Sequence, residues 1–390
     1  MPAVPSPIPL FWGAALFANH SFSILTRETG KALLRRKEID LTFLPFGASE
    51  FDPTASPDYA SILAACIGNK KATAALSSSI KPIMVRLQFP LRPFPPPKMT
   101  WVAYHPWEYS RAPKASVEVM NRTKEVWTPS RFCVDAFVRS GVPAEKIHVI
   151  PNGVDLEIYQ PHGKQATLPT SKPFKFLFVG GTIYRKGTDV LLDAYRRAFT
   201  SADPVSLVIK DFGKRGIYPF ERGAELIREF AQNPSYPEVV HVPSHRTDAE
   251  MAELYRACDI FVSSYRGEGF CLPALEAMAC GKPVIVTAGG ATDDFVSSAD
   301  GWHIPASLRR HGDTVFNMPL DGETELFEPD VDALVELLQK AYRNEADRRA
   351  RGVAAAKSAQ AWSWEAAADK IVTRCQALTT STSQSKQRFI

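Results

Sequence analysis

The sequence predicts an α/β protein of two doubly wound, Rossmann-like domains that face each other across a central cleft. Three observations lead to this fold class. The chain has 390 residues, which is too long for one ordinary core. Short apolar runs alternate with helix-like segments in two sets, as expected of parallel sheets with helices on both faces. A polar stretch at 161–172 separates the two sets and is the expected linker.

The first set of elements spans residues 1–160, the expected first domain. Its strands are short apolar runs and its helices carry apolar residues at helical spacing. The expected strands are Pro9–Trp12, Leu41–Leu44, Ile83–Leu87, Trp101–Tyr104, Glu125–Trp127 and Ile147–Ile150, and the expected helices are Ser21–Arg35, Ser116–Asn121 and Ser130–Ser140. Gly13 is expected to open the turn after the first strand.

The second set spans residues 173–365, the expected second domain, and residues 366–390 are expected to form a terminal helix and a frayed tail. The expected strands are Phe174–Val179, Val205–Ile209, Val239–Val242, Asp259–Val262 and Val284–Thr287. The expected helices are Thr188–Phe199, Glu221–Glu229, Asp248–Ala257, one beginning near Pro273, Val331–Tyr342 and Trp364–Ala377. Parallel sheets bind ligands beyond the carboxyl ends of their strands, so each domain is expected to hold one substrate at the cleft.

The composition excludes several classes of function. The net charge is only +4 and no aromatic–basic motif appears, so we expect no nucleic-acid partner. The six cysteines lack zinc or redox spacing, which favours reduced thiols in a cytoplasmic protein. No apolar run reaches the roughly 18 residues of a membrane span. Peripheral contact with the inner membrane face stays open.

Residues 267–285, with the sequence GEGFCLPALEAMACGKPVI, carry the main functional motif. Glu268 and Glu276 lie eight positions apart, and between them Gly269 favours a loop and Pro273 favours the first turn of a helix. Both carboxylates are therefore expected near a helix N-terminus, where unpaired backbone N–H groups attract anions. A nucleotide sugar, with hydroxyls and phosphates, fits that combination. Carboxylates at helix starts are also ordinary stabilising features, so the spacing alone leaves both interpretations open.

This motif resembles the Glu-x7-Glu signature of family 4 of the retaining glycosyltransferases, which have the GT-B fold. Three further stretches resemble that family, in the family's order: Pro151–Asp155, Phe178–Gly187 with its Gly180-Gly181 and Arg185-Lys186-Gly187, and Cys258–Ser264. The resemblance covers most of residues 101–300 and is loose before residue 100. It implies a metal-independent enzyme that moves a sugar from a nucleoside-diphosphate sugar, UDP- or GDP-linked, to an acceptor hydroxyl with retention of configuration. No other cofactor is implied.

The resemblance also implies roles for single residues. Glu268 would contact the donor sugar, Glu276 the ribose, and Lys186 the diphosphate. Arg185 would supply a second cation, because Thr182 stands where many members of the family have arginine. The implied catalytic residues are His105, Lys186 and Glu268. The implied donor-binding residues are Gly13, Arg185, Lys186, Lys210, Glu268, Gly269, Phe270, Cys271, Leu272 and Glu276, with Glu108 and Arg131 on the acceptor side and no metal ligand.

Plainer interpretations compete at several of these positions. His105 ends an apolar strand, where histidine is often structural, although parallel sheets also place their chemistry there. Taken alone, Lys186 is a solvated lysine at a helix start and Arg131 a surface residue. Cys271 is expected to be a packing residue, since no base lies near it in the sequence.

Two other functions stay open at this point: a GT-B-fold phosphorylase or epimerase, and a catalytically silent homologue that only binds nucleotide sugars. The acceptor is a carbohydrate, a lipid-linked sugar, a protein or a small molecule. Aromatic residues near the start of the chain are explained better by core packing than by acceptor binding, and the proline-rich loop 90–97 is a candidate acceptor surface. The oligomeric state does not follow from the sequence.

Overall fold

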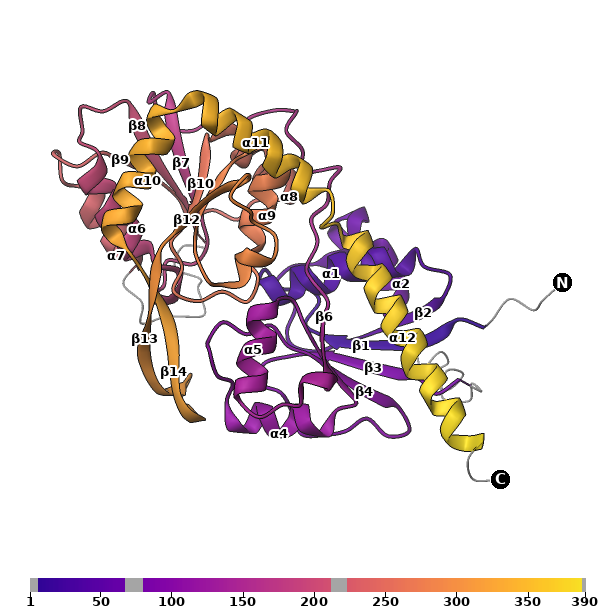
Figure 1. Ribbon diagram of the computed structural model, residues 1–390. Helices are drawn as coiled ribbons and strands as arrows, with labels where there is room; N and C mark the ends of the chain where they lie inside the picture. The colour runs from indigo at the N-terminus through magenta and orange to yellow at the C-terminus, as the bar shows by residue number, and fades with distance from the viewer. Residues whose placement is uncertain (1–5, 67–79, 212–222, 388–390) are drawn as a thin grey trace.

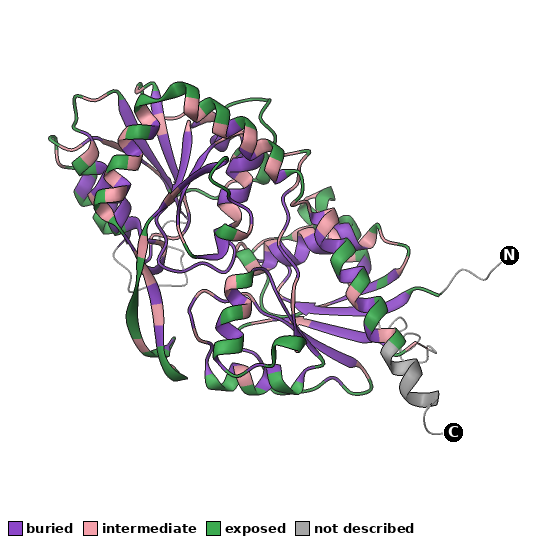
Figure 2. Cartoon of the chain, viewed as in Figure 1, coloured by how far each residue is buried: buried purple, intermediate pink, exposed green. Residues whose placement is uncertain are grey.

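The computed structural model describes residues 6–66, 80–211 and 223–387, with side chains to residue 380. Within these residues the chain forms two domains, each built on a six-stranded parallel sheet, and a long two-stranded hairpin. Figure 1 shows the domains one above the other, with helices packed around each sheet. The strands of the two six-stranded sheets are largely buried, whereas the helices and the hairpin expose their outer sides (Figure 2).

The sheet of the first domain has the strand order β2-β1-β3-β4-β5-β6. The strands are parallel, and the order in which they follow one another in the sequence reverses between β1 and β3. Its strands are β1 (Ile8–Ala14), β2 (Ile39–Pro45), β3 (Ile83–Leu87), β4 (Thr100–Tyr104), β5 (Glu125–Thr128) and β6 (Ile147–Val149). Its helices are α1 (Ser21–Leu34), α2 (Ala60–Ala65), α4 (Lys114–Arg122) and α5 (Arg131–Arg139). Trp12, Phe43 and Val102 are among the fully buried residues of its core.

The sheet of the second domain has the strand order β12-β11-β10-β7-β8-β9. The order in which its parallel strands follow one another in the sequence reverses between β7 and β10. Its strands are β7 (Phe174–Val179), β8 (Val205–Lys210), β9 (Glu238–Val242), β10 (Ile260–Ser263), β11 (Val284–Thr287) and β12 (Gly301–Ile304). Its helices are α6 (Thr188–Ala198), α7 (Gly223–Ala231), α8 (Asp248–Ala257), α9 (Leu272–Ala279), α10 (Val331–Arg343) and α11 (Glu345–Ala359). Such switch points are where doubly wound sheets bind ligands.

A hairpin of β13 (Ala306–Val315) and β14 (Met318–Pro329) leaves the second domain and lies beside the first (Figure 1). Its Leu320 and Leu326 join a hydrophobic cluster of the first domain that includes Trp107. The backbone N–H of Glu325 donates to Ser110 Oγ at 2.7 Å. The hairpin therefore holds the two domains together along one side of the cleft.

The chain crosses between the domains twice, at adjacent places. Val154 N–H donates to Trp362 O at 2.8 Å, and a Cβ on Gly153 would lie 2.2 Å from the backbone nitrogen of Trp364. Only glycine lets the crossing segments approach so closely. After the second crossing, α12 (Trp364–Gln387) packs on the first domain, where Ile371 and Cys375 are fully buried.

Some expected boundaries differ from those observed. β1 continues through Gly13, which pairs with Leu44 and Arg86, because the longer neighbouring strands extend the ladder. The last helix was expected to end at Ala377, yet α12 continues to Gln387 since no Gly or Pro interrupts it. The expected linker 161–172 runs along α8, where Arg256 donates to Lys164 O at 2.8 Å. Residues 221 and 222 of one expected helix lie outside the described residues.

None of the helices in the described parts of the chain has the length and apolar character needed to cross a membrane.

Candidate active site

Two polar loops meet at the switch point of the second sheet. One follows β7 and contains the turn Tyr184–Lys186; the other follows β10 and leads into α9. β7 and β10 are neighbouring parallel strands, so both loops leave the same edge of the sheet. This topology brings Lys186 and Glu268 together as an ion pair between Nζ and Oε1.

Arg185 completes a cluster of two cations and two carboxylates. Its Nη1 lies 3.6 Å from Glu268 Oε2, and its Nη2 lies 3.3 Å from Glu108 Oε1 of the first domain. Arg185 and Glu268 are buried, at 8% and 6% exposure. Charges so far from water are tolerated because each faces an opposite charge.

The turn that carries Arg185 and Lys186 is fixed by a glycine and an arginine. Gly187 has a φ of 67°, and a Cβ there would lie 1.8 Å from Ser264 O. Arg266 N–H donates to Arg185 O at 2.7 Å, and the Arg266 guanidinium lies 3.9 Å from the centre of the Tyr184 ring. The loop that carries Glu268 therefore holds the turn with the two cations in place.

Arg266 itself is held by a carboxylate on each side. Its guanidinium donates to both oxygens of Asp189, in the first turn of α6, at 2.8 Å. It also donates to both oxygens of Glu328, on the hairpin, at 3.0 and 2.9 Å. This residue joins the cationic turn, α6 and β14 in one network.

The two domains touch at the signature loop. A Cβ on Gly267 would lie 2.2 Å from Glu108 O, and one on Gly269 would lie 3.1 Å from Trp107 O. Ser130, the N-cap of α5, donates to Gly269 O at 2.7 Å. The glycines of the motif therefore let the first domain close directly onto the loop that carries Glu268.

The N-terminus of α9 is suited to an anion. Its N-cap, Cys271, has a left-handed backbone with a φ of 69°, and no side chain caps the first turn. Pro273 lies in that turn, as expected from the sequence. Uncapped N–H groups and the helix dipole favour negative charge here. Burial raises the pKa of the Cys271 thiol to about 12, which agrees with a packing role.

Glu276, one turn into α9, faces a separate interdomain cavity and accepts a hydrogen bond from Tyr255 at 2.6 Å. Glu28 from α1, Asp248 from α8 and Leu272 line the same cavity. Its volume is about 10 Å³, roughly the space of one water molecule. Burial raises the pKa of Glu276 to about 7.

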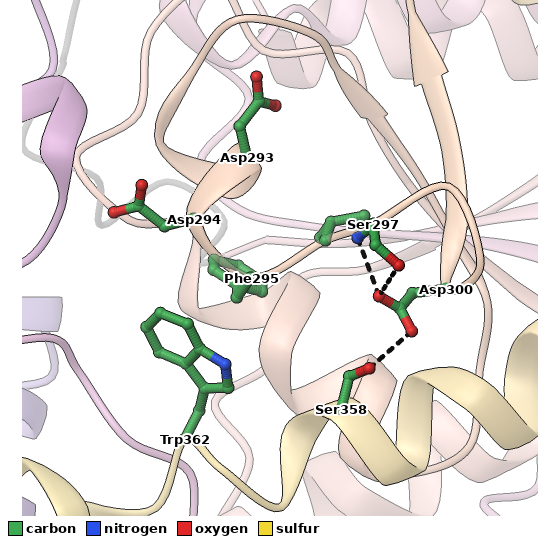
Figure 3. A pocket seen from close by; sticks show the side chains of 8 residues that line it. Asp293, Asp294, Phe295, Ser297, Asp300, Ser358 and Trp362 are labelled. Carbon is green, nitrogen blue, oxygen red and sulfur yellow. Dashed lines mark hydrogen bonds between the residues drawn. The ribbon is translucent and has the colours of Figure 1, made fainter.

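A second hollow, of about 310 Å³, lies beside the second crossing (Figure 3). Asp300 is held at its edge by Ser297 and by Ser358, whose Oγ donates at 2.8 Å. The Trp362 ring lies 5.6 Å from that of Phe295. Ser297, Asp300 and Ser358 thus bond to one another, whereas Asp293 and Asp294 accept from the backbone N–H groups of Gly289 and Arg131.

Two models of glycosyltransferase families match adjoining parts of the chain. The model described as "Glycosyltransferase Family 4" matches residues 18–158, and "Glycosyl transferases group 1" matches residues 161–310. D-inositol 3-phosphate glycosyltransferase 1 of Catenulispora acidiphila is 30% identical over 40% of this chain and 38% of its own length. MMP alpha-(1->4)-mannosyltransferase of Mycolicibacterium hassiacum is 28% identical over 42% and 36%. The chain thus spans less than half the length of these curated relatives.

Solved structures match nearly the whole chain. Sucrose-phosphate synthase of Thermosynechococcus elongatus has a TM-score of 0.66 at 19% identity, covering 96% of this chain and 100% of that one. Anabaena HepE in complex with UDP-glucose has a TM-score of 0.63 at 14% identity, covering 95% and 100%. This chain has the GT-B fold. The predicted fold class is confirmed, and similarity to glycosyltransferases runs through both GT-B domains.

His105 follows β4 and lies in the interior of the first domain. It is fully buried, and its ring stacks with those of Phe89, Trp107 and Phe137 at 5.8–6.1 Å. Among the described residues neither ring nitrogen has a hydrogen-bond partner. Burial lowers the pKa of His105 to about 4, so the ring is neutral near pH 7. Its contact with a substrate stays a prediction.

Four other predicted residues have neighbours of their own in the structure. Lys210 is buried at the end of β8, where Nζ donates to Asp211 O at 2.7 Å. A Cβ on Gly13 would come no closer than 3.7 Å to any neighbour, so protein packing does not require glycine there. Arg131 is exposed at the start of α5, and its N–H donates to Asp294 Oδ2 at 2.8 Å. Phe270 is buried, with its ring 5.0 Å from that of Phe295.

Sequence reasoning missed Arg266, Tyr255 and the hairpin. Arg266 stands between β10 and the Gly-Glu-Gly stretch. An arginine between a buried strand and the main motif could have indicated a residue that supports the site. Tyr255 lies on α8 with no local sign that it faces Glu276. In the described chain, no three His, Cys, Asp or Glu side chains gather as a metal site.

Proposed function

We propose that this protein is a glycosyltransferase that moves a sugar from a nucleoside-diphosphate sugar to an acceptor hydroxyl, with retention of the anomeric configuration. The observation that supports this most is the cluster of Arg185, Lys186 and Glu268 at the switch point, beside the uncapped start of α9. Cations, a helix N-terminus and a carboxylate together suit a ligand with a diphosphate and sugar hydroxyls.

Donor binding exchanges partners within this cluster. Without a donor, Glu268 and Glu108 neutralise the two cations. The donor diphosphate takes over Arg185 and Lys186, and the freed oxygens of Glu268 accept hydrogen bonds from the sugar. Glu276 binds the ribose hydroxyls further along α9. Each buried charge has an opposite charge as a partner both with and without the donor, so the exchange costs little free energy.

In the transfer step the bond between the anomeric carbon and the phosphate oxygen breaks, and the acceptor oxygen bonds to the same carbon from the same face. The acceptor proton moves to the departing phosphate oxygen. Negative charge grows on the diphosphate as it leaves, so Arg185, Lys186 and the N–H groups at the start of α9 stabilise the transition state more than the bound donor. No cofactor or metal is part of this proposal.

UDP is the first nucleotide to test, because the structural neighbour HepE was solved with UDP-glucose, and GDP is the second. Calorimetry with UDP, GDP, UDP-glucose and GDP-mannose measures donor binding. Lys186→Ala removes a charge-assisted contact worth about 1.5–3 kcal/mol, which weakens binding roughly ten- to hundredfold. Lys340→Ala, an exposed lysine on α10, is the matched control and retains wild-type affinity.

Product analysis separates the proposal from its rivals. Release of nucleoside diphosphate together with a product that keeps the donor's anomeric configuration by NMR supports it. An inverted product contradicts retention alone. Turnover with inorganic phosphate as the sole acceptor identifies a phosphorylase. Donor binding without release of diphosphate, across a broad acceptor panel, identifies a silent homologue.

A further inference from the structure

The tip of the hairpin carries an aromatic residue in an unusual backbone conformation. Phe316 and Asn317 connect β13 to β14 with φ values of 51° and 60°. A two-residue turn of this kind favours Asn-Gly or Asp-Gly, and a bulky residue with positive φ is rare. The Phe316 side chain stays 44% exposed, so burial does not account for its presence. Strain kept at a half-exposed position suggests a use for the ring.

The Phe316 ring lies against the first domain. Its centre is 5.5 Å from that of Phe89 and 6.2 Å from that of Tyr109. Phe89 is 37% exposed and stacks on the buried His105. The hairpin tip and Phe89 therefore form an exposed aromatic corner directly above the histidine at the end of β4.

Aromatic rings continue from this corner to the donor cations. Tyr109 lies 5.7 Å from His311 on β13, and His311 stacks on Tyr184 at 6.1 Å with an angle of 12° between the rings. Tyr184 is 45% exposed and directly precedes Arg185. We call Phe89, Tyr109, His311, Phe316 and Tyr184 the aromatic belt. It draws on both domains and on the hairpin, and one end of it lies at the charged cluster.

The chemistry of the aromatic belt suits a carbohydrate. The apolar C–H face of a pyranose ring stacks on exposed aromatic rings, and its hydroxyls bond to polar groups at their edges. Glu108 and Arg111 flank Tyr109 in the sequence, and the His311 ring interrupts the hydrocarbon faces. A lipid surface needs a continuous apolar face instead. An exposed patch of this kind beside a proposed transfer site indicates a binding surface.

We propose that the aromatic belt is the acceptor subsite and that it holds a carbohydrate acceptor by stacking a pyranose ring on Phe316 and Phe89. The acceptor continues along the belt past Tyr109 and His311, so that a later sugar ring presents a hydroxyl toward Tyr184 and Arg185. The inference rests on the proposed function, and it narrows the acceptor to a carbohydrate. It also gives the hairpin a task in acceptor selection.

Binding measurements that need no turnover test this subsite. The probes are an immobilised panel of mono- to tetrasaccharides ending in glucose, galactose, mannose or N-acetylglucosamine, and, separately, UDP-glucose by calorimetry. Phe316→Asn suits the left-handed turn and therefore keeps the hairpin. We expect it to weaken glycan binding at least tenfold and to leave UDP-glucose binding within twofold of wild type. Phe316→Tyr retains glycan binding, as does Leu308→Ala, which removes an exposed apolar side chain elsewhere on β13.

The outcomes distinguish this inference from the proposed function. Unchanged glycan binding by both Phe316→Asn and Phe89→Ala overturns the subsite, as does an equal loss of UDP-glucose affinity in Phe316→Asn. Binding of the wild type to glycan-free phosphatidylglycerol vesicles, with no binding to any glycan, overturns it in favour of a lipid surface. A wild type that binds UDP-glucose but no glycan overturns it too. Failure to bind any nucleotide sugar, with glycan binding that depends on Phe316, contradicts the proposed function and leaves the subsite supported.

Discussion

Glu276 is a carboxylate in a setting that opposes its charge. Burial raises its pKa to about 7, and the hydrogen bond from Tyr255 only partly offsets this. Glu28 and Asp248 face the same cavity, and burial raises the pKa of Glu28 as well. A ribose diol is held best by an ionised carboxylate, which accepts from both hydroxyls. The protonation state of Glu276 should therefore control donor affinity near neutral pH.

We expect UDP affinity to rise with pH and to level off above about 7, where Glu276 is ionised. Calorimetry between pH 5.5 and 8.5 measures this. Glu276→Gln should bind more weakly and lose the pH dependence; an equally steep profile in that variant would contradict the assignment.

The pH dependence of stability has the opposite sign. The folded pKa lies above the ordinary 4.5, so the folded state holds the extra proton and the contribution of Glu276 to the free energy of unfolding falls as pH rises from 4.5 to about 7.

Gly187 gives the cationic turn a backbone conformation and a close approach to Ser264 that other residues do not allow. Gly187→Ala combines positive-φ strain, about 1–3 kcal/mol, with an overlap against Ser264 O. We expect a clear loss of stability in urea unfolding and at least tenfold weaker UDP binding. Gly141→Ala is the matched control, because Gly141 has a φ of 94° with nothing within 4 Å of the added Cβ. If both variants lose stability equally and both keep UDP affinity, the turn is not held as described.

At the scale of elements, the local motifs follow from the residues themselves, whereas the grouping of Glu268 with Lys186 and Arg185 was implied only by the family resemblance. Glu268, Pro273 and the start of α9 follow from one continuous stretch, whose glycines, proline and apolar residues specify a loop and a helix. The residues that surround Glu268 come from other elements: Glu108 follows β4, and Lys186 follows β7. No local sequence pattern specifies these contacts, because the order of the strands in the sheet determines which loops lie next to each other.

The hairpin escaped prediction for a related reason. β13 is exposed along most of its length, so it lacks the apolar alternation that identifies a strand. Its turn, Phe316-Asn317, lacks the usual glycine, and register shifts near Gly312 blur its period further. Parallel strands such as β7 and β10 are buried on both faces and appear in the sequence as apolar runs, which is why most strands of the two sheets could be predicted. The edge strand β12, with the sequence Gly-Trp-His-Ile, was missed.

Arg266 ties the hairpin to the donor site, and this network can be tested. Arg266→Lys keeps the charge but loses the planar fork that bonds both Asp189 and Glu328. We expect a loss of about 1–3 kcal/mol in urea unfolding, typical of a broken buried network. We also expect a raised KM for the donor sugar with a smaller change in the acceptor KM, because the turn with Arg185 and Lys186 loses its support. Arg310→Lys, an exposed arginine of β13, is the control and should change neither. Equal changes in both KM values would point to a general loss of structure instead.

At the scale of the whole molecule, the two domains pack directly against each other around the signature loop. The loop with Trp107 and Glu108 packs on Gly267 and Gly269, and the cavity at Glu276 has space for about one water molecule. A nucleoside is far larger than that cavity. The chain crosses between the domains at two adjacent places, at Val154 and Trp362, and we expect the domains to rotate about this connection. We therefore expect donor entry to require that the domains separate first.

Locking the domains together tests this requirement. Arg131 N–H of the first domain donates to the Asp294 carboxylate of the second at 2.8 Å, so an engineered disulfide between these neighbouring positions would join the two domains. The native thiols are free, and all but that of Cys66 are buried. We expect the oxidised Arg131→Cys/Asp294→Cys variant to bind UDP at least tenfold more weakly than its reduced form, with affinity restored by dithiothreitol. The single variants control for loss of the side chains and should not respond to oxidation. Undiminished UDP binding by the oxidised variant would show that the donor enters without separation of the domains.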